Sequence, residues 1–492
     1  MNTFVIMPLP MNLKFILCFL VMFASVSTKA QNAYEIKVTL KPFTSGYIFL
    51  AHHYGSRQML VDSAAVDQNS QVVFKGAEKL PGGIYMLVFP KKDGWVEVII
   101  DKEQKFSVSA DSANVVGSLA FTGSRDNEVF KAYLKFSQKY GTEMSALQKT
   151  YATATNRADS AKIEAQLQAK SQDIKKYRDQ FIKDNPQHLL SSVFKVFKEP
   201  AIPPAIKEQQ LANQYYRRHY WDSMDLADDR LLRTPVFQVK LDRYFDDIVP
   251  PIPDTLKMEA DDVILRTRVN PEMKKYVLLH LTDKYVNPKY MGQDAVFVHL
   301  FTKYYIPGDA DGWLNEKNKK FIYDRGYSLM MNVIGDKAAN LNLVDTLGKM
   351  KTLYEVASPY TIVCFWDPTC GHCQTEVPQL DSIYNAKWIN KGVKIFGVMT
   401  DGGFDKWKAF ISEHNLKNWT HVYQTKELKE NELKSGQPGF RQLYDVYQTP
   451  MLYLLDKDKK ILAKKLNYEQ LNEFLDRKFS AAESPAANPV PR

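Results

Sequence analysis

The stretch of sequence that decides the fold is Thr361-Ile-Val-Cys-Phe-Trp-Asp-Pro-Thr-Cys-Gly-His-Cys-Gln-Thr-Glu-Val-Pro378. Its first six residues predict a buried strand, and the run that follows predicts a helix opening at Cys370 and Cys373. Two cysteines at this spacing can form a disulfide with little movement of the backbone. The free N–H groups and the positive end of the helix dipole favour a thiolate on the first of them. The stretch therefore predicts a redox-active dithiol.

Length and composition indicate a multi-domain globular protein. The chain has 492 residues, too many for one hydrophobic core, so about three folded units are expected. Its apolar content of 45% and charged content of 25% are ordinary for a soluble protein. The formal charge of +9 is spread along the chain and not gathered in one run, so nothing in it indicates nucleic-acid binding.

Residues 1–30 have the pattern of a secretory signal peptide. Lys14 supplies a short basic region, residues 15–24 are apolar, and the small residues up to Ala30 fit a cleavage site. Residues 15–18 resemble a lipobox, but cleavage after Ala30 and a soluble product are favoured. No later run is long and apolar enough to span a membrane, so we expect membrane contact only through anchoring or docking.

The remaining cysteines are few and close together. Cys18 is removed with the predicted signal peptide, which leaves Cys364, Cys370 and Cys373 within ten residues. An exported chain without scattered disulfides relies on its hydrophobic cores for stability. We therefore expect its thiols to serve chemistry.

The mature chain divides into four predicted segments. Residues 31–123 contain short alternating runs between turn signals, which predict an antiparallel β-sandwich-like domain. Residues 124–330 predict an α-helical region that begins with a long hairpin of helices capped by Ser124 or Asp126. Residues 331–480 alternate strands and helices, which predicts a sheet with helices on its faces. The last segment, 481–492, is rich in Ala and Pro and predicts a disordered tail.

The individual elements follow from the same patterns. The expected strands are 34–40, 47–51, 72–74, 84–89, 95–100, 106–109, 341–344, 360–366, 393–399, 451–455 and 461–463. Beyond the hairpin, the expected helices are 274–285, 295–305, 316–331, 370–390, 406–413 and 468–479.

Two other motifs have residue types that occur in binding sites. His52 and His53 lie beside a strand end, but no third ligand stands at useful spacing, so a surface pair is favoured and no metal site is expected. The run Tyr215–Trp221 is aromatic and basic, and its helical spacing favours packing in a core and its rim over a binding surface.

The carboxy-terminal motifs resemble the thioredoxin superfamily. The resemblance rests on Phe365-Trp366 before the Cys-Gly-His-Cys motif, Pro378 in the helix, and Thr449-Pro450 before a strand. The lead-in Ile334–Leu341 and the spacing of Glu376 and Pro378 are most similar to the extracytoplasmic TlpA/ResA-like branch. The β-rich domain followed by helices resembles the leading part of large TlpA-like proteins of Bacteroidetes. The resemblance implies a thioredoxin fold, thiol–disulfide oxidoreductase activity without a cofactor, and a periplasmic or cell-envelope location.

The motif suggests a role for each of its residues. Cys370, on the exposed side of the helix start, is expected to attack as a thiolate, and the more buried Cys373 to resolve the mixed disulfide. Gly371 and His372 complete a motif similar to that of protein disulfide isomerases, in which an imidazolium would shift the couple towards the oxidising side. A half zinc site would lack its second ligand pair. Covalent haem attachment would need a histidine at the position of Gln374.

The residues around the motif carry further expectations. The resemblance implies that Pro450 is cis and that Thr449 offers its backbone to a substrate chain; the alternative is an ordinary proline at a strand start. Glu376 is either a proton acceptor or an exposed helix residue, and the sequence leaves both open. Cys364 stands where thioredoxins often have a buried Asp, and an inert buried thiol is favoured over a third redox thiol. Asp367 is the nearest carboxylate that could replace the missing one.

The sequence is compatible with three functions. The first is a thiol–disulfide oxidoreductase that works on protein thiols and disulfides with an upstream redox donor or acceptor, in a direction that the sequence leaves open. The second is a peroxiredoxin, which would need a threonine where Asp367 stands. The third is a non-catalytic metal- or partner-binding surface protein. A homodimer through the N-terminal or helical region is also left open.

Overall fold

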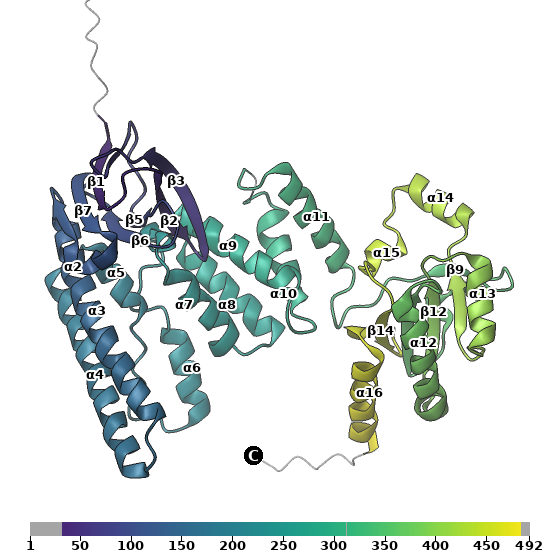
Figure 1. The fold of residues 1–492 in the computed structure, drawn as a ribbon. Coiled ribbons are helices and arrows are strands. Elements are labelled where there is room, and N and C mark those ends of the chain that lie inside the picture. Colours follow the sequence, from purple (N-terminus) through teal and green to yellow (C-terminus); the bar gives the residue numbers. More distant parts are fainter. Residues whose placement is uncertain (1–31, 311, 484–492) are drawn as a thin grey trace, which may run out of the picture. The chain divides into compact units, whose positions relative to one another are not determined.

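The computed structural model describes residues 32–310 and 312–483, so the predicted signal peptide lies outside the described residues (Figure 1). The described residues group into two compact units, divided between Asp242 and Arg243. This division falls inside the predicted helical region. The segment boundaries drawn from the sequence stay a prediction.

Two four-stranded sheets form the β-rich part of the first unit. Their strand orders are β4-β1-β7-β8 and β3-β2-β5-β6. The strands are β1 (Tyr34–Lys41), β2 (Tyr47–Tyr54), β3 (Arg57–Ala65), β4 (Gln71–Gly76), β5 (Gly83–Val88), β6 (Trp95–Ile100), β7 (Lys105–Asp111) and β8 (Ala120–Thr122).

The predicted strand-rich domain is confirmed, with two corrections. First, β1 and β7 run parallel, whereas every other neighbouring pair is antiparallel. Alternation along a strand indicates which face is buried and not the direction of its neighbour, so the sequence could not reveal this pair. Second, β3 and β8 were not predicted, because β3 is exposed along most of its length and β8 is only three residues long.

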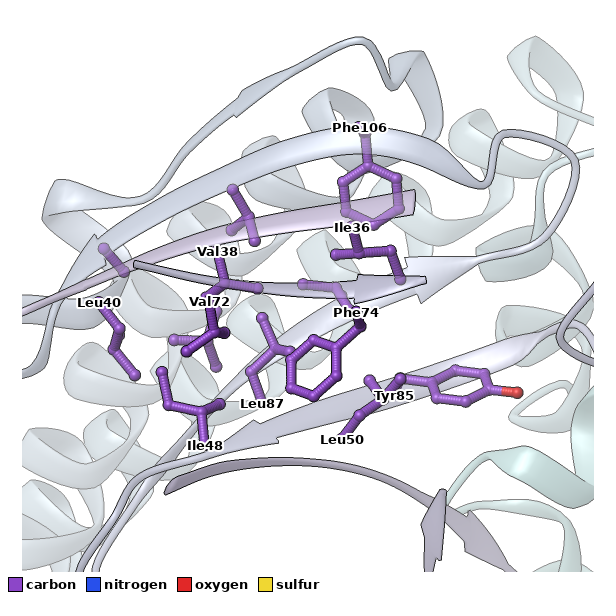
Figure 2. Packing of buried hydrophobic residues seen from close by; sticks show 14 of the residues in the cluster. Ile36, Val38, Leu40, Ile48, Leu50, Val72, Phe74, Tyr85, Leu87 and Phe106 are labelled. Atoms are coloured by element: carbon purple, nitrogen blue, oxygen red, sulfur yellow. The ribbon is translucent and has the colours of Figure 1, made fainter. Parts of the chain in front are cut away.

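The core of these sheets follows from the alternation that predicted the strands. Along β1, Ile36, Val38 and Leu40 are buried, and they meet Leu50 and Leu87 from the other sheet (Figure 2). Full burial of each such side chain contributes about 1.5–3 kcal/mol. Both sheets therefore share one hydrophobic core.

A helical hairpin follows the sheets, as predicted. It consists of α3 (Arg125–Ala152) and α4 (Arg157–Asp184). The Ser124 side chain accepts the backbone N–H of Asn127 and caps α3. The buried Asn127 amide in turn bonds the backbone N–H and C=O of Ile99 at 2.8 and 2.7 Å, which fastens the hairpin to β6.

Further helices fill the middle of the chain. They are η1 (Ser112–Asn114), α2 (Val115–Ser118), α5 (Leu189–Val196), α6 (Gln209–His219), η2 (Asp229–Arg233), α7 (Phe237–Arg243), η3 (Tyr244–Ile248), α8 (Pro253–Arg266), α9 (Pro271–Val286), α10 (Asp294–Leu300), η4 (Phe301–Tyr305) and α11 (Glu316–Met330). Tyr220 and Trp221 are buried, in agreement with the core-and-rim interpretation of that run.

The second unit contains a seven-stranded mixed sheet of order β10-β9-β13-β12-β11-β14-β15. Its strands are β9 (Asn342–Asp345), β10 (Met350–Thr352), β11 (Tyr360–Trp366), β12 (Lys394–Met399), β13 (Thr420–Tyr423), β14 (Met451–Asp456) and β15 (Ile461–Leu466). Its helices are η5 (Leu353–Glu355), α12 (Gly371–Ile383), η6 (Tyr384–Trp388), η7 (Ile389–Lys391), α13 (Phe404–Glu413), α14 (Lys426–Ser435), α15 (Phe440–Leu443) and α16 (Tyr468–Glu483).

Strand β11 lies in the middle of this sheet, parallel to β12 and antiparallel to β14. Its alternate side chains enter two different cores. Cys364 and Trp366 pack in the core that contains α12, α13 and α16, and Val363 and Phe365 pack in the core on the opposite face. The predicted sheet with helices on both faces is confirmed.

Three details differ from the sequence expectations. A single helix was predicted for residues 370–390. The structure has the shorter α-helix α12, followed by the π-helical η6 and the 3-10 helix η7. Helix α16 runs to Glu483, three residues into the predicted tail, and residues 484–492 lie outside the described residues. Strands β10 and β13 and helix α15 were not predicted, because each is too short to show a period. Helix α14 was not predicted because its ten residues are nearly all polar and none is buried.

Within the described residues, no helix is both long and apolar enough to cross a membrane.

Candidate active site

The dithiol lies where β11 meets α12. After Trp366 the chain turns through Asp367, whose carboxylate accepts the backbone N–H and the hydroxyl of Thr369, both at 2.7 Å. Cys370 is the N-cap of α12 and is partly buried, and Cys373 is fully buried one turn later. Both cysteines are free thiols in the structure. The strand-to-helix layout predicted from the sequence is therefore present.

The surroundings of Cys370 favour its thiolate. Burial alone raises the pKa of this thiol, but the polar groups beside its sulfur, namely the backbone N–H groups of Cys373 and His372 and the Thr449 side chain, outweigh burial, so the pKa is lowered. Two of these donors are unpaired N–H groups of the first helical turn, which is where a thiolate is best stabilised.

The two inner thiols behave in the opposite way. Burial raises the pKa of Cys373 to about 12, although the backbone N–H of Asp367 donates to its sulfur at 3.4 Å. Burial also raises the pKa of Cys364 well above its usual value, and the charges of Cys373 and Glu376 raise it further. Near neutral pH only Cys370 has an environment that supports a thiolate.

Cys364 lies on the central strand β11 and is buried in the core that contains α12, α13 and α16. It pairs in register with Gly397 of β12 and Leu452 of β14, and its side chain is 0% exposed. Asp367 does not take the place of a buried carboxylate, since its side chain is engaged with Thr369. Its contact with the dithiol is made by its backbone N–H.

Glu376 is partly buried, and its charge acts on Cys364 and on Tyr468. The side chain is thus close enough to Cys364 to affect it electrostatically. Its role as a proton acceptor stays a prediction. Gly371 and His372 lie on the exposed side of the first turn, and a Cβ added at Gly371 would meet nothing within 4 Å.

The chain returns to the dithiol at Thr449 and Pro450. The peptide bond between them is cis, as predicted. The Cys370 thiol donates to the carbonyl oxygen of Thr449 at 3.4 Å. The structure thus brings together four of the predicted site residues: Cys370, Cys373, Thr449 and Pro450.

One buried titratable residue near this core was not predicted. His421 lies on β13 in contact with the rings of Trp366, Trp407 and Trp419, and its Nε2 donates to the Leu416 carbonyl at 2.7 Å. Burial lowers its pKa to about 4, against the effect of the Leu416 hydrogen bond. The sequence held no signal for it, because a single histidine in a four-residue strand shows no pattern.

The first histidine pair makes a local contact. The Nδ1 atom of His52 lies 2.6 Å from the carbonyl oxygen of His53. In the part of the chain that the structure describes, no group of three or more His, Cys, Asp or Glu side chains is arranged to hold a metal ion.

Comparison with known proteins places the site in a family. The model of the AhpC/TSA family matches residues 334–464. This segment is a thioredoxin-like domain. The thiol-disulfide oxidoreductase ResA of Bacillus thuringiensis is 26% identical to this chain over 147 residues, which are 29% of this chain and 78% of ResA. The thioredoxin-like domain therefore belongs with the thiol–disulfide oxidoreductases.

Two solved structures are also similar. A domain of a possible thiol-disulfide isomerase from Cytophaga hutchinsonii is 34% identical, with a TM-score of 0.27, and the match covers 31% of this chain and 97% of that domain. A thioredoxin-like protein from Bacteroides caccae is 25% identical, with a TM-score of 0.45, and the match covers 57% of this chain and 98% of that protein.

The region before the thioredoxin-like domain matches two other family models. Residues 34–130 match the domain of unknown function DUF4369, and residues 153–328 match the domain of unknown function DUF5106. The first match covers the β-rich part together with the start of α3, and the second covers most of the helices.

Proposed function

We propose that the protein is an extracytoplasmic thiol–disulfide oxidoreductase that exchanges disulfides with protein substrates through Cys370 and Cys373. The observation that carries the proposal is the difference in acidity between the two sulfurs. Cys370 has a lowered pKa and is partly exposed, whereas burial raises the pKa of Cys373 to about 12. An attacking thiolate and a protonated resolving thiol are what sequential exchange requires.

In the reductive direction, the Cys370 thiolate attacks one sulfur of a substrate disulfide. The substrate S–S bond breaks, a mixed disulfide forms, and the second substrate sulfur leaves as a thiolate. This thiolate takes the proton that Cys373 releases as Cys373 attacks the Cys370 sulfur. The first substrate sulfur, displaced from Cys370, leaves as a thiolate and takes a proton from solvent. The substrate thus gains two electrons and leaves with two thiols, and the protein holds a Cys370–Cys373 disulfide. An upstream dithiol then reduces that disulfide.

The residues beside the dithiol have supporting roles in this proposal. Thr449 lies next to Cys370, and its backbone is available to bind a substrate chain that reaches the cysteines. Glu376 accepts the proton that Cys373 releases and passes it on to the departing substrate thiolate. His372 stabilises the Cys370 thiolate, which stabilises the reduced form and raises the reduction potential. The direction of exchange follows from this potential relative to that of the partner.

The extracytoplasmic location rests on the signal-peptide pattern of residues 1–30. Export agrees with where the cysteines of the mature chain lie. All three are in the segment from β11 to the first turn of α12, and none is placed to form a structural disulfide elsewhere. Partners are therefore expected among proteins that gain or lose disulfides outside the cytoplasm.

A peroxiredoxin activity is the second candidate, because the matching family model is that of AhpC/TSA. Such an enzyme would orient the peroxide with a threonine hydroxyl three residues before the reactive cysteine. Asp367 stands there, and its carboxylate is already hydrogen-bonded to Thr369. We therefore expect peroxide to oxidise Cys370 slowly. A non-catalytic metal-binding protein would instead bind copper(I) through the reduced cysteines and lose it in Cys370→Ser.

The proposal is tested by disulfide reduction with the mature protein. Reduced wild-type protein is expected to cleave the disulfides of insulin, and Cys370→Ser to lose this activity. Cys373→Ser is expected to accumulate a mixed disulfide with the substrate, because the resolving thiol is missing. Equal rates for wild type and Cys370→Ser would overturn the proposal, whereas rapid turnover of peroxide would favour the second candidate.

A further inference from the structure

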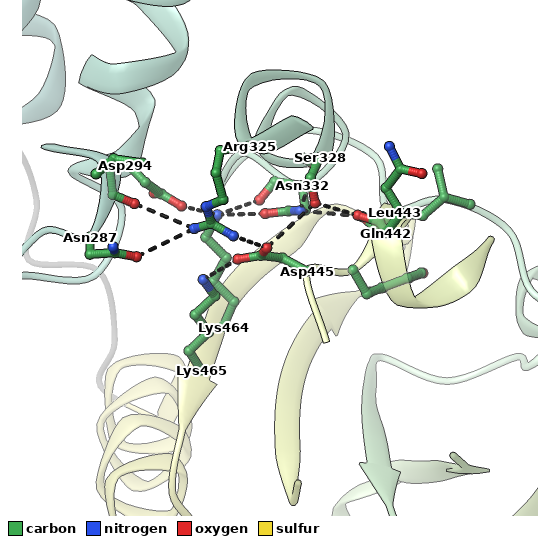
Figure 3. A network of polar contacts seen from close by, with 12 residues as sticks. Asn287, Asp294, Arg325, Ser328, Asn332, Gln442, Leu443, Asp445, Lys464 and Lys465 are labelled. Atoms are coloured by element: carbon green, nitrogen blue, oxygen red, sulfur yellow. Dashed lines mark hydrogen bonds and ion pairs between the residues drawn. The ribbon is translucent and has the colours of Figure 1, made fainter. Parts of the chain in front are cut away.

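A buried network of charges joins helix α11 to the segment that leads to Thr449 (Figure 3). The Arg325 guanidinium donates to one carboxylate oxygen of Asp445, and the Lys465 ammonium lies 2.5 Å from the other. The side chains of Arg325 and Asp445 are 9% and 1% exposed. Residue 325 thus binds a site that lies 120 positions later in the chain.

Ser328 of α11 and Asn332, two residues beyond the end of this helix, fasten the same segment through its backbone. The Ser328 hydroxyl donates to the Gln442 carbonyl at 2.5 Å, and the Asn332 amide donates to the Leu443 carbonyl at 3.2 Å. Both carbonyls belong to α15, immediately before Asp445. The end of α11 and the residues just after it therefore hold consecutive residues of this segment in one place.

A second buried cation fixes the end of α11 to β15. The Lys464 ammonium donates to the backbone and side-chain oxygens of Asn332 at 2.6 and 2.8 Å and lies 2.5 Å from the Asp294 carboxylate. Its side chain is 2% exposed. Since Lys465 is the next residue of β15, α10, α11 and β15 meet around Asp445.

The backbone at Asp445 needs this support. Its φ is +51°, in the left-handed region that non-glycine residues seldom adopt. Such a conformation persists when the surrounding structure holds it, and it is often found beside functional sites. Residues 444–450, here named the proline loop, begin beside this conformation and end at the cis Thr449–Pro450 peptide.

Arg325 also contacts the exposed part of the proline loop. Its guanidinium carbon lies 5.4 Å from the ring centre of Tyr447, which is 72% exposed. Tyr447 lies two residues before Thr449, whose carbonyl accepts the Cys370 thiol. One side chain of α11 is thus linked to the dithiol through a short piece of chain.

We propose that Arg325 is a positioning residue of the dithiol site, which sets where Thr449 meets Cys370 by holding Asp445 and Tyr447. The helices before the thioredoxin-like domain would then be part of the site's construction. Buried ion pairs are weak sources of stability compared with apolar packing, but they favour one arrangement over others. The proposal rests on the proposed function for the reaction that the site performs.

The test is the pH profile of Cys370 alkylation by iodoacetamide in the reduced mature protein, which needs no protein substrate. Arg325→Met is expected to displace Thr449 from Cys370 and so to weaken the stabilisation that Thr449 gives the thiolate. The profile then shifts to higher pH, and alkylation at pH 7 slows about tenfold, as loss of a hydrogen bond to a charged group predicts. Arg325→Lys keeps the charge but loses the planar guanidinium. Its alkylation profile is expected to lie between those of the wild type and Arg325→Met.

Arg266→Met is the matched control, because Arg266 pairs with Asp262 on the exposed face of α8. An Arg325→Met protein that is less stable but has the alkylation profile of this control would overturn the proposal. If Arg325→Met does not fold, the alkylation profile of Arg325→Lys is compared with that of the control, and an unshifted profile would overturn the proposal. A shifted profile in a protein that reduces no disulfide would sink the proposed function and leave the positioning role standing.

Discussion

The Cys370 thiol and the Thr449 carbonyl oxygen lie 3.4 Å apart, although 79 positions separate them in the chain. This contact joins the start of α12 to the proline loop and places a cis peptide bond next to the sulfur with the lowered pKa. A substrate chain that reached Cys370 would therefore also lie next to the backbone of Thr449. The predictions below follow from this arrangement.

The three thiols should differ in reactivity towards iodoacetamide at pH 7. Cys370 should be alkylated, because its pKa is lowered. Cys373, with a pKa of about 12, and Cys364, which is fully buried, should remain unmodified in the folded protein. Peptide mass spectrometry after brief labelling measures the three separately, and comparable labelling of Cys373 and Cys370 would contradict the account.

Replacing His372 with alanine should make the dithiol more reducing. The backbone N–H that bonds Cys370 is retained in this variant, so only the imidazole is tested. We expect the reduction potential to fall by about 30 mV, which corresponds to about tenfold in the exchange equilibrium. The measurement is equilibration with glutathione, and His414→Ala, at an exposed position after α13, is the control. An unchanged potential would remove His372 from the account.

Cys364→Ala should leave the potential and the rate of disulfide reduction unchanged. Its thiol is fully buried in the core that contains α12, α13 and α16 and has a raised pKa, so it behaves as a small apolar side chain. Deleting its buried sulfur should lower the free energy of unfolding by about 1 kcal/mol. Urea unfolding and redox titration measure the two effects, and a shifted potential would instead make Cys364 a third redox thiol.

His421 should make stability depend on pH. Its pKa is about 4 when folded and 6.5 in an ordinary setting, so between these values the unfolded chain binds more protons. The resulting stabilisation is present above pH 6.5, is lost as the pH falls towards 4, and amounts to about 3 kcal/mol. Urea unfolding at pH 7 and pH 4.5 should give a smaller difference for His421→Gln than for wild type. Equal differences would show that His421 is not buried as a neutral group.

Much of the dithiol site could be predicted from the sequence because its information is local. The apolar run before Trp366 indicated a buried strand, and β11 is one, with Cys364 and Trp366 packed in the same core. The spacing of Cys370 and Cys373 indicated the helix start and hence the favoured thiolate. The cis bond before Pro450 was predicted from the resemblance to thioredoxins.

The rest could not be predicted because it depends on residues far apart in the chain. The ion pair of Arg325 and Asp445 joins two positions that carry no shared pattern. The parallel pairing of β1 with β7 is likewise a matter of tertiary arrangement. The sequence offers Asp367 as a substitute for a buried carboxylate. Its side chain instead accepts a hydrogen bond from Thr369, and this contact depends on the geometry of the turn.

The most direct test of the central claim is a redox titration of the mature protein, with each cysteine quantified by differential alkylation and mass spectrometry. The account predicts a single two-electron transition in which Cys370 and Cys373 form a disulfide together while Cys364 remains a thiol. It would be contradicted if Cys370 and Cys373 remained reduced in the most oxidising buffer, or if the disulfide formed between Cys364 and Cys373.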